Sequence, residues 1–176
     1  MHAKKILALL QGGDRRSIGR ANKVAALVSK NLALFHELIQ GLWSDDPVVR
    51  MRSADAAEKV SRDNPKILQP YKRELVGLLS ETDQQELRWH LAAMVPRLDL
   101  KPRERNSVQE ILKRYLDDRS SIVKTFALQA LFDLATRHPA LRPEVIEILR
   151  ESLRNGTPAM KARSRKLLPT LERLST

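Results

Sequence analysis

Basic and aromatic side chains recur along this chain at spacings that can place them on one surface. Basic groups interleaved with aromatic rings can follow a phosphate backbone and stack nucleobases. The same residue types supply the anchors of protein interfaces. Packing between helices for the rings, and a solvated face for the charges, are the plainer alternatives. The candidate binding residues are Arg52, Lys59, Trp89, His90, Arg97, Phe126, Arg163 and Lys166.

Residues that perform catalysis or hold metals do not occur here in recognisable patterns. No histidine has a second His or Cys at the spacing of a zinc site, the four being His2, His36, His90 and His138. The chain has no P-loop, no Gly-rich dinucleotide-binding turn and no GxSxG motif. The adjacent carboxylates Asp45-Asp46 and Asp117-Asp118 suit turns and helix caps. The sequence therefore predicts no enzyme, no metal site and no cofactor.

The composition indicates one helical domain. The chain has 176 residues, of which 42% are apolar and only 4% aromatic, so its core must consist of Leu, Ala, Val and Ile. It has no cysteine, which suits a reducing compartment, and we expect a cytoplasmic protein. No apolar run approaches the ~20 residues of a membrane span. The apolar run at residues 6–10 is too short for a signal peptide, and we interpret residues 2–11 as an amphipathic helix.

The net charge of +11 is concentrated at both ends of the chain. Residues 1–30 carry seven Lys and Arg against one acidic residue, and residues 97–176 carry seventeen against ten. Residues 31–96 carry eight basic residues against ten acidic ones, so the middle is slightly acidic. Such an excess of basic residues favours an anionic partner, either nucleic acid or another polyanion.

One supersecondary unit is used five times. A basic residue follows an apolar one at Arg50, Arg88, Lys124 and Lys161, and more loosely at Arg20 after Gly19. Six residues earlier stands a side chain that can accept a hydrogen bond, at Asp14, Ser44, Thr82, Asp118 and Asn155. These basic residues are 30, 38, 36 and 37 positions apart, a period typical of helical solenoids. We expect a single domain over 1–176, with repeats at roughly 1–30, 31–63, 64–100, 101–138 and 139–176.

Helical periodicity orients the candidate residues. In the second helix of each repeat, positions −1, +3, +4 and +7 from the basic residue face the core, and positions +2, +5 and +9 point the opposite way, into a groove. Helices near 17–30 and 47–62 are expected, the latter capped by Asp46 with Pro47 in its first turn. Pro96 should bend or end its helix. Arg165 occupies a position that is apolar in the other repeats, so the final helix should be partly uncovered.

The segment Asp46-Pro47-Val48-Val49-Arg50, a turn opening an Ala-rich helix, resembles HEAT repeats. It is similar in style to the short bacterial HEAT-like repeats grouped with phycobilisome lyases, although nothing here supports pigment chemistry. The resemblance implies an all-α, right-handed superhelix of helical hairpins with an armadillo-type fold, whose second helices line a concave face. It also implies a structural ladder between repeats, joining Arg20, Arg50, Arg88, Lys124 and Lys161 to acceptors at Asp14, Ser44, Thr82, Asp118 and Asn155.

Three functions stay open at this point. We expect a non-catalytic binding or scaffold module that contacts a protein partner through the concave face. The alternative is binding of a nucleic-acid backbone through the basic groove. A more distant alternative is an alkylpurine DNA glycosylase, since those enzymes resemble HEAT-like repeats and place an Asp one helical turn after a groove Trp. Here that position after Trp89 is Ala93. The sequence names neither the partner nor the oligomeric state.

Overall fold

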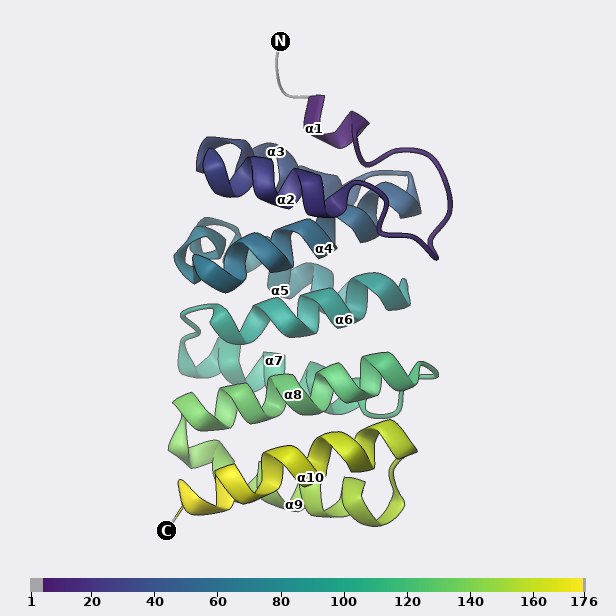
Figure 1. Ribbon diagram of the computed structural model, residues 1–176. Coiled ribbons are helices and arrows are strands. Elements are labelled where there is room, and N and C mark those ends of the chain that lie inside the picture. The colour runs from purple at the N-terminus through teal and green to yellow at the C-terminus, as the bar shows by residue number, and fades with distance from the viewer. Residues whose placement is uncertain (1–4, 176) are drawn as a thin grey trace.

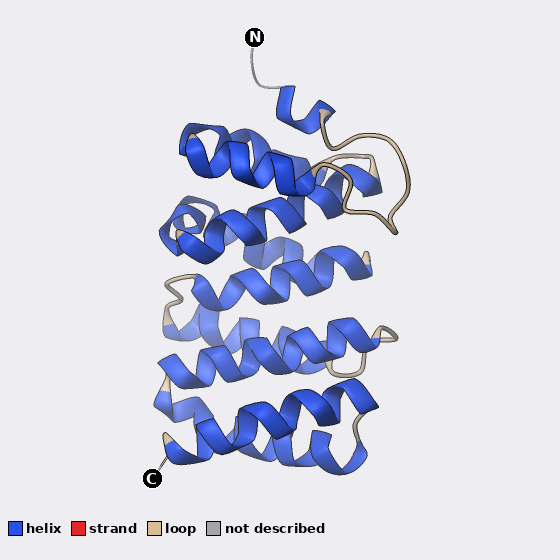
Figure 2. Ribbon diagram, in the orientation of Figure 1, coloured by secondary structure: helices blue, strands red, loops and turns tan. Residues whose placement is uncertain are grey.

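A computed structural model describes residues 5–175, and their regular structure is entirely helical (Figure 2). Ten α-helices follow one another in this part of the chain (Figure 1): α1 (Lys5–Ala8), α2 (Ala21–Lys30), α3 (Phe35–Gln40), α4 (Pro47–Asp63), α5 (Lys72–Glu81), α6 (Gln85–Met94), α7 (Pro102–Tyr115), α8 (Ser121–Arg137), α9 (Arg142–Asn155) and α10 (Pro158–Arg173). Short 3₁₀ helices join or extend them: η1 (Leu32–Leu34), η2 (Gly41–Trp43), η3 (Pro65–Tyr71), η4 (Val95–Arg97) and η5 (Pro139–Leu141).

The helices form two layers. The second helices α2, α4, α6, α8 and α10 lie side by side in one layer, and α3, α5, α7 and α9 lie behind them (Figure 1). Each second helix packs against the next one in sequence. The expected all-α solenoid of helical hairpins is confirmed. No helix among residues 5–175 is both long and apolar enough to cross a bilayer.

Local sequence explains where the second helices begin. The Asp46 carboxylate accepts a hydrogen bond from the Val48 amide at 2.8 Å, and Pro47 occupies the first helical position. Ser120 and Thr157 cap α8 and α10 in the same way. Pro96 has the expected effect, because α6 ends at Met94 and a single 3₁₀ turn follows.

The core follows the predicted positions over most of the chain. Val24, Ala54, Ala92 and Leu128, four residues after each basic residue, are fully buried, whereas Arg165 at this position is exposed. Leu27 is an exception, since it is 38% exposed although the pattern places it in the core. It lies on α2, the end of the second-helix layer, which has only α4 as a neighbour in that layer.

The first repeat departs from the pattern. The helix expected near 2–11 covers Lys5–Ala8 within the described residues, and the helix expected near 17 begins at Ala21. Residues 9–20 form a loop, which we call the strap. Gly12, Gly13 and Gly19 in the strap have φ values of +79°, +76° and +51°. A right-handed helix cannot continue through this left-handed conformation, so the three glycines give the strap its turns.

Candidate binding face

The candidate residues lie on the outward side of the second helices, which we call the second-helix face. Arg52 and Lys59 come from α4, Trp89 and His90 from α6, and Arg97 from η4 just after it. Phe126 comes from α8, and Arg163 and Lys166 come from α10. The periodicity therefore brings all eight to one layer of helices, but their surroundings differ from one end of the layer to the other.

Arg52 is not available to a ligand, which corrects the expectation from its helical position. Its side chain is 3% exposed, because the strap wraps around it. The guanidinium donates hydrogen bonds to five backbone carbonyls at 2.6–3.4 Å, those of Leu10, Gln11, Gly12, Asp14 and Ser17. Arg52 therefore holds the strap on the second-helix face.

The glycines of the strap allow this close approach. A Cβ atom at Gly19 would lie 2.7 Å from the Arg52 Cζ atom, and one at Gly13 would lie 3.2 Å from its Nη2 atom. A residue with a side chain would strain the backbone and also meet the guanidinium at Gly19. Gly19 lies inside the helix expected near 17–30, and it was the signal in the sequence that this helix begins later, at Ala21.

Lys59 and Arg97 are also bonded within the protein. The Lys59 ammonium donates to Asp55 Oδ2 and to Asn22 Oδ1, both at 2.6 Å, and so joins α4 to α2. Arg97 donates to the Glu58 carbonyl and to Ser61 Oγ, both at 2.8 Å, and forms an ion pair with the Glu58 carboxylate. Burial alone would raise the pKa of Glu58, but hydrogen bonds from Arg62 and Arg97 hold it below its ordinary value.

Trp89 and His90 form the aromatic part of α6. Their ring centroids are 5.7 Å apart with planes tilted by 54°, and both residues are half-buried. Burial lowers the pKa of His90 to about 4, although Asp55 and Glu58 act in the opposite direction. His90 is therefore uncharged near neutral pH and does not act as a cationic contact.

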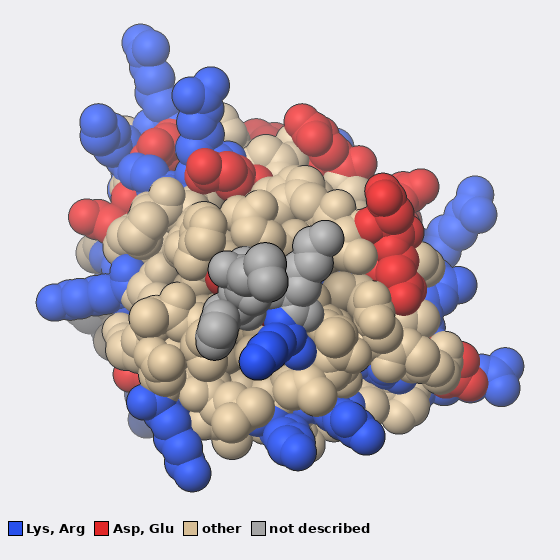
Figure 3. Space-filling model, turned by 90° about the horizontal axis from the view of Figure 1, so that it is seen from above, with Lys and Arg blue, Asp and Glu red and all other residues tan. Residues whose placement is uncertain are grey.

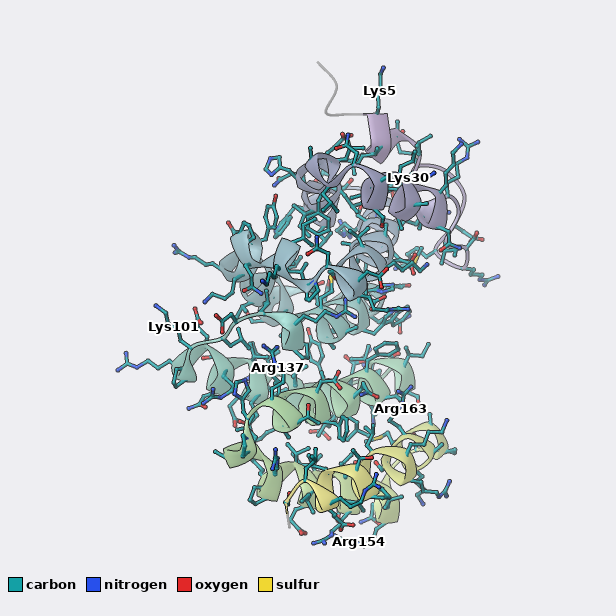
Figure 4. All side chains as sticks on the ribbon, turned by 60° about the vertical axis from the view of Figure 1, so that its left-hand side comes forward. Lys5, Lys30, Lys101, Arg137, Arg154 and Arg163 are labelled. Atoms are coloured by element: carbon teal, nitrogen blue, oxygen red, sulfur yellow. The ribbon has the colours of Figure 1, made fainter. Side chains whose placement is uncertain are left out.

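The part of the face over α8 and α10 is more open. Phe126 is half-buried, Lys166 is exposed, and Arg163 donates one hydrogen bond to Gln129 Oε1 at 2.7 Å. Figure 4 shows Arg163 where α10 runs alongside α8. Ile122, in the first turn of α8, is 49% exposed. Sequence reasoning missed Ile122, although position −2 shares a helix face with +2 and an extension of the pattern would have included it.

Two rungs of the expected ladder are present. Arg50 donates to the Ser44 carbonyl and to Gln84 Oε1 of the next repeat, both at 2.7 Å. Arg88 donates to the Thr82 carbonyl at 2.8 Å and to Asp118 Oδ2 at 2.6 Å, and lies 5.4 Å from the ring centroid of Tyr115. Ser44 and Thr82 thus contribute backbone carbonyls rather than side chains, and the acceptor Gln84 was not predicted.

The other expected rungs do not form among residues 5–175. Arg20 is exposed at the end of the strap, and Asp14 accepts instead from the Arg16 amide at 2.9 Å. Lys124 and Lys161 have no hydrogen bond to Asp118 or Asn155, since one carboxylate oxygen of Asp118 binds Arg88 and the other binds the Ser120 amide, and the Asn155 amide donates to Glu151. A single ammonium also offers less reach than the planar guanidinium of arginine.

The described residues contain no group of three or more His, Asp or Glu side chains arranged to hold a metal ion. The second-helix face carries four cations bonded within the protein, the exposed cation of Lys166, three half-buried rings and the exposed aliphatic side chain of Ile122.

Comparison with known proteins supports the fold alone. No protein-family model matches the chain, and no curated protein matches it. It is similar to the crystal structure of an engineered protein, a target of the Northeast Structural Genomics Consortium, with a TM-score of 0.65. The similarity covers 97% of this chain and 79% of the engineered one, at 18% sequence identity. At that identity the comparison shows that this chain shares an all-helical solenoid architecture with the engineered protein.

Proposed function

We propose that this chain is a non-catalytic, HEAT-like binding module of the cytoplasm that docks a protein partner on its second-helix face. The observation that carries the proposal is the contrast on that face between cations with internal partners and apolar side chains that stay exposed. Its enclosed cations are bonded within the protein, as at Arg52, Lys59 and Arg97, whereas the apolar side chains of Ile122, Phe126 and Trp89 retain exposed surface.

The apolar surface has the composition of an interface core. Ile122 and Phe126 are four residues apart on α8 and so share a helix face, and α6, which carries Trp89, packs directly against α8. Aromatic residues surrounded by polar ones are typical of binding hot spots. A backbone phosphate instead needs free cations, and most of those predicted for this face already have partners.

The HEAT-like assignment rests on the ladder and on the sequence. Arg50 and Arg88 each bond the turn of their own repeat and a side chain of the next one, as the resemblance implies. The helix start at Asp46-Pro47 carries the best-matching motif. The cytoplasmic assignment rests on the absence of cysteine.

Affinity capture with the immobilised full chain tests the proposal. Wild type, the double variant Ile122→Asp/Phe126→Asp and the control Leu174→Asp are compared, with captured proteins quantified by mass spectrometry. Leu174 is 45% exposed but lies beyond the end of α10. We expect the same proteins with wild type and the control, and their loss with the double variant. Capture that survives the double variant, or that a nuclease abolishes, contradicts the proposal.

Nucleic-acid binding through α10 is the second candidate, favoured by one observation. Arg165 and Lys166 are exposed and make no hydrogen bond within the described part of the chain. Viewed from the N-terminal end, however, basic side chains project on several sides of the molecule rather than along one track (Figure 3).

Fluorescence anisotropy with labelled DNA and RNA, from low to physiological salt, separates the two functions. We expect only weak binding that disappears by physiological salt, because few phosphates can be neutralised. A steep log-linear salt dependence that begins from tight binding, and that is removed by changing Arg165 and Lys166 to Gln, would favour the second candidate.

A further inference from the structure

A cleft of about 1050 Å³ opens at the edge of the solenoid where the second helices begin. Residues from the start of α4, the start of α6 and the end of α7 line it, together with Arg15 from the strap. Figure 1 shows the strap reaching the same edge, close to the first turn of α6. The cleft therefore lies where the strap, the ladder and the second-helix face meet.

Glu86 lines this cleft, and one oxygen of its buried carboxylate accepts no hydrogen bond among the described residues. The residue is 6% exposed, and the oxygen concerned is Oε2. A buried carboxylate oxygen that lacks a donor loses its hydration without compensation. Glu86 occupies position −2 of its repeat, the same face as His90 one turn later. Its carboxylate is thus placed at the turn end of the second-helix face.

The nearest cation is not firmly bound to Glu86. Arg15 Nη1 lies 3.9 Å from Oε2, too far for a hydrogen bond, and the Arg15 side chain is 54% exposed. Arg15 belongs to the strap, whose residues 11–20 are all exposed. The Arg15 guanidinium therefore lies over the Glu86 carboxylate without a hydrogen bond, so another cation can displace it.

Four other arginines line the cleft; Arg114 and Arg119 are exposed at the end of α7 and in the turn after it, and the other two are bonded elsewhere. Arg50 is bonded to the Ser44 carbonyl and Gln84, and Arg88 to the Thr82 carbonyl and Asp118. Neither donates to Glu86.

We propose that Glu86 is the seat of an arginine side chain from the protein partner, whose guanidinium replaces that of Arg15. A planar guanidinium offers paired donors to a carboxylate, and the cleft is wide enough to admit such a side chain from outside. This inference rests on the proposed function, since it names the chemical group by which the partner is anchored at the edge of the second-helix face.

The probe for this site is N-acetyl-arginine amide, which carries a single guanidinium, and the matched neutral probe is N-acetyl-citrulline amide. Each is titrated into the ¹⁵N-labelled full chain and followed by amide chemical shifts. We expect saturable shifts in the first turn of α6 with the arginine probe only. Glu86→Gln should weaken binding by about tenfold or more, because it removes a charged hydrogen-bond partner.

Arg15→Ala provides the opposing variant. Removing the resident cation should strengthen binding of the arginine probe several-fold, because the probe no longer competes with it. Asp83→Asn, at an exposed carboxylate in the same cleft, is the control and should leave the affinity unchanged. If Glu86→Gln perturbs folding, the strengthening by Arg15→Ala in an otherwise wild-type chain still decides the question.

The inference is overturned if Arg15→Ala weakens binding of the arginine probe, since Arg15 then does not compete with it for Glu86, or if Glu86→Gln binds the probe as wild type does. Partner capture separates this failure from that of the proposed function. A partner lost on Ile122→Asp/Phe126→Asp but unaffected by Glu86→Gln overturns the inference alone. Specific binding of the arginine probe, with no partner captured through Ile122 and Phe126, supports the site and contradicts the proposed function.

Discussion

The second-helix face has a closed half at α4 and α6, next to the strap, and an open half over α8 and α10. Arg52 and Arg163 show the contrast, since each lies two residues after the basic residue of its repeat. Arg52 is 3% exposed and bonds five carbonyls of the preceding repeat, whereas Arg163 is half-buried and bonds one side chain. Equivalent positions in a repeat thus have different roles.

The cause of the contrast lies outside the helices. Helical periodicity determines the direction of a side chain, but a separate segment determines what lies against it. In the closed half that segment is the strap, and among the described residues no loop of comparable length folds over α8 or α10. The pattern of one repeat therefore predicts in which direction the equivalent side chains of other repeats point, but it does not predict how exposed they are.

The largest effect that would sharpen this comparison is expected from Arg52→Ala. Truncation leaves five strap carbonyls without their donor, and we expect the free energy of unfolding to fall by about 2–4 kcal/mol. The matched variant Arg163→Ala, at the equivalent position, should cost under about 1 kcal/mol. Urea unfolding followed by circular dichroism measures both. Equal costs would show that the two halves do not differ.

A smaller effect should appear as pH dependence in the closed half. The pKa of His90 is about 4 in the folded protein, below its ordinary value of 6.5, so protonation favours the unfolded chain. The stability contributed by neutral His90 is complete above pH 6.5 and is lost as the pH falls towards 4. At pH 5 the loss should be on the order of 2 kcal/mol.

The His90→Gln variant isolates this contribution. The groups that face His90 are Asp55, Glu58, Lys59 and Glu86, and they stay in place in the variant. We expect its free energy of unfolding to fall less than that of wild type between pH 7 and pH 5. The exposed His36→Gln serves as the control and should follow wild type. A His90→Gln curve parallel to that of wild type contradicts the burial of a neutral imidazole.

The smallest effect distinguishes two glycines. Gly19→Ala places a side chain at φ +51° and against the Arg52 guanidinium, and should destabilise the protein by about 1–2 kcal/mol. Gly77→Ala, inside α5 with no atom within 4 Å of the added Cβ, should stabilise it by about 0.5–1 kcal/mol. Thermal unfolding gives both values. The same sign for both substitutions would mean that the strap does not require its glycine.

The sequence predicts the solenoid because its helices are specified locally. Asp46 and Pro47 mark a helix start, Pro96 marks a helix end, and the apolar positions recur with helical spacing, so that each unit can be recognised alone. Exposed Arg165 follows from the same pattern. These features need no knowledge of the neighbouring repeat.

The candidate site is less predictable because its properties depend on contacts between distant segments. Arg52 and the strap carbonyls are 35 to 42 residues apart in the chain. The ladder shows the same limit, since the spacing identified Arg50 and Ser44 but not that a backbone carbonyl would accept, nor that Gln84 would complete the rung. By contrast, helical periodicity could have placed Glu86 and Ile122 on this face, because both occupy position −2 of their repeats.

The ladder has a consequence for how such a chain can lengthen. Solenoids grow by duplication of a repeat. A unit inserted after residue 63 would part Arg50 from Gln84 and would part the enclosed ion pair of Arg97 and Glu58. After residue 138 it would part the more exposed ion pair of Lys113 and Glu144, the bond from Arg163 to Gln129 and the neutral pair of Ser121 and Thr157 hydroxyls, 3.0 Å apart. We therefore expect the later junction to accept an extra repeat at lower cost, which the unfolding free energies of the two insertion variants would measure. The end of the molecule that holds the ladder is thus expected to resist insertion of a repeat, and the other end to accept one.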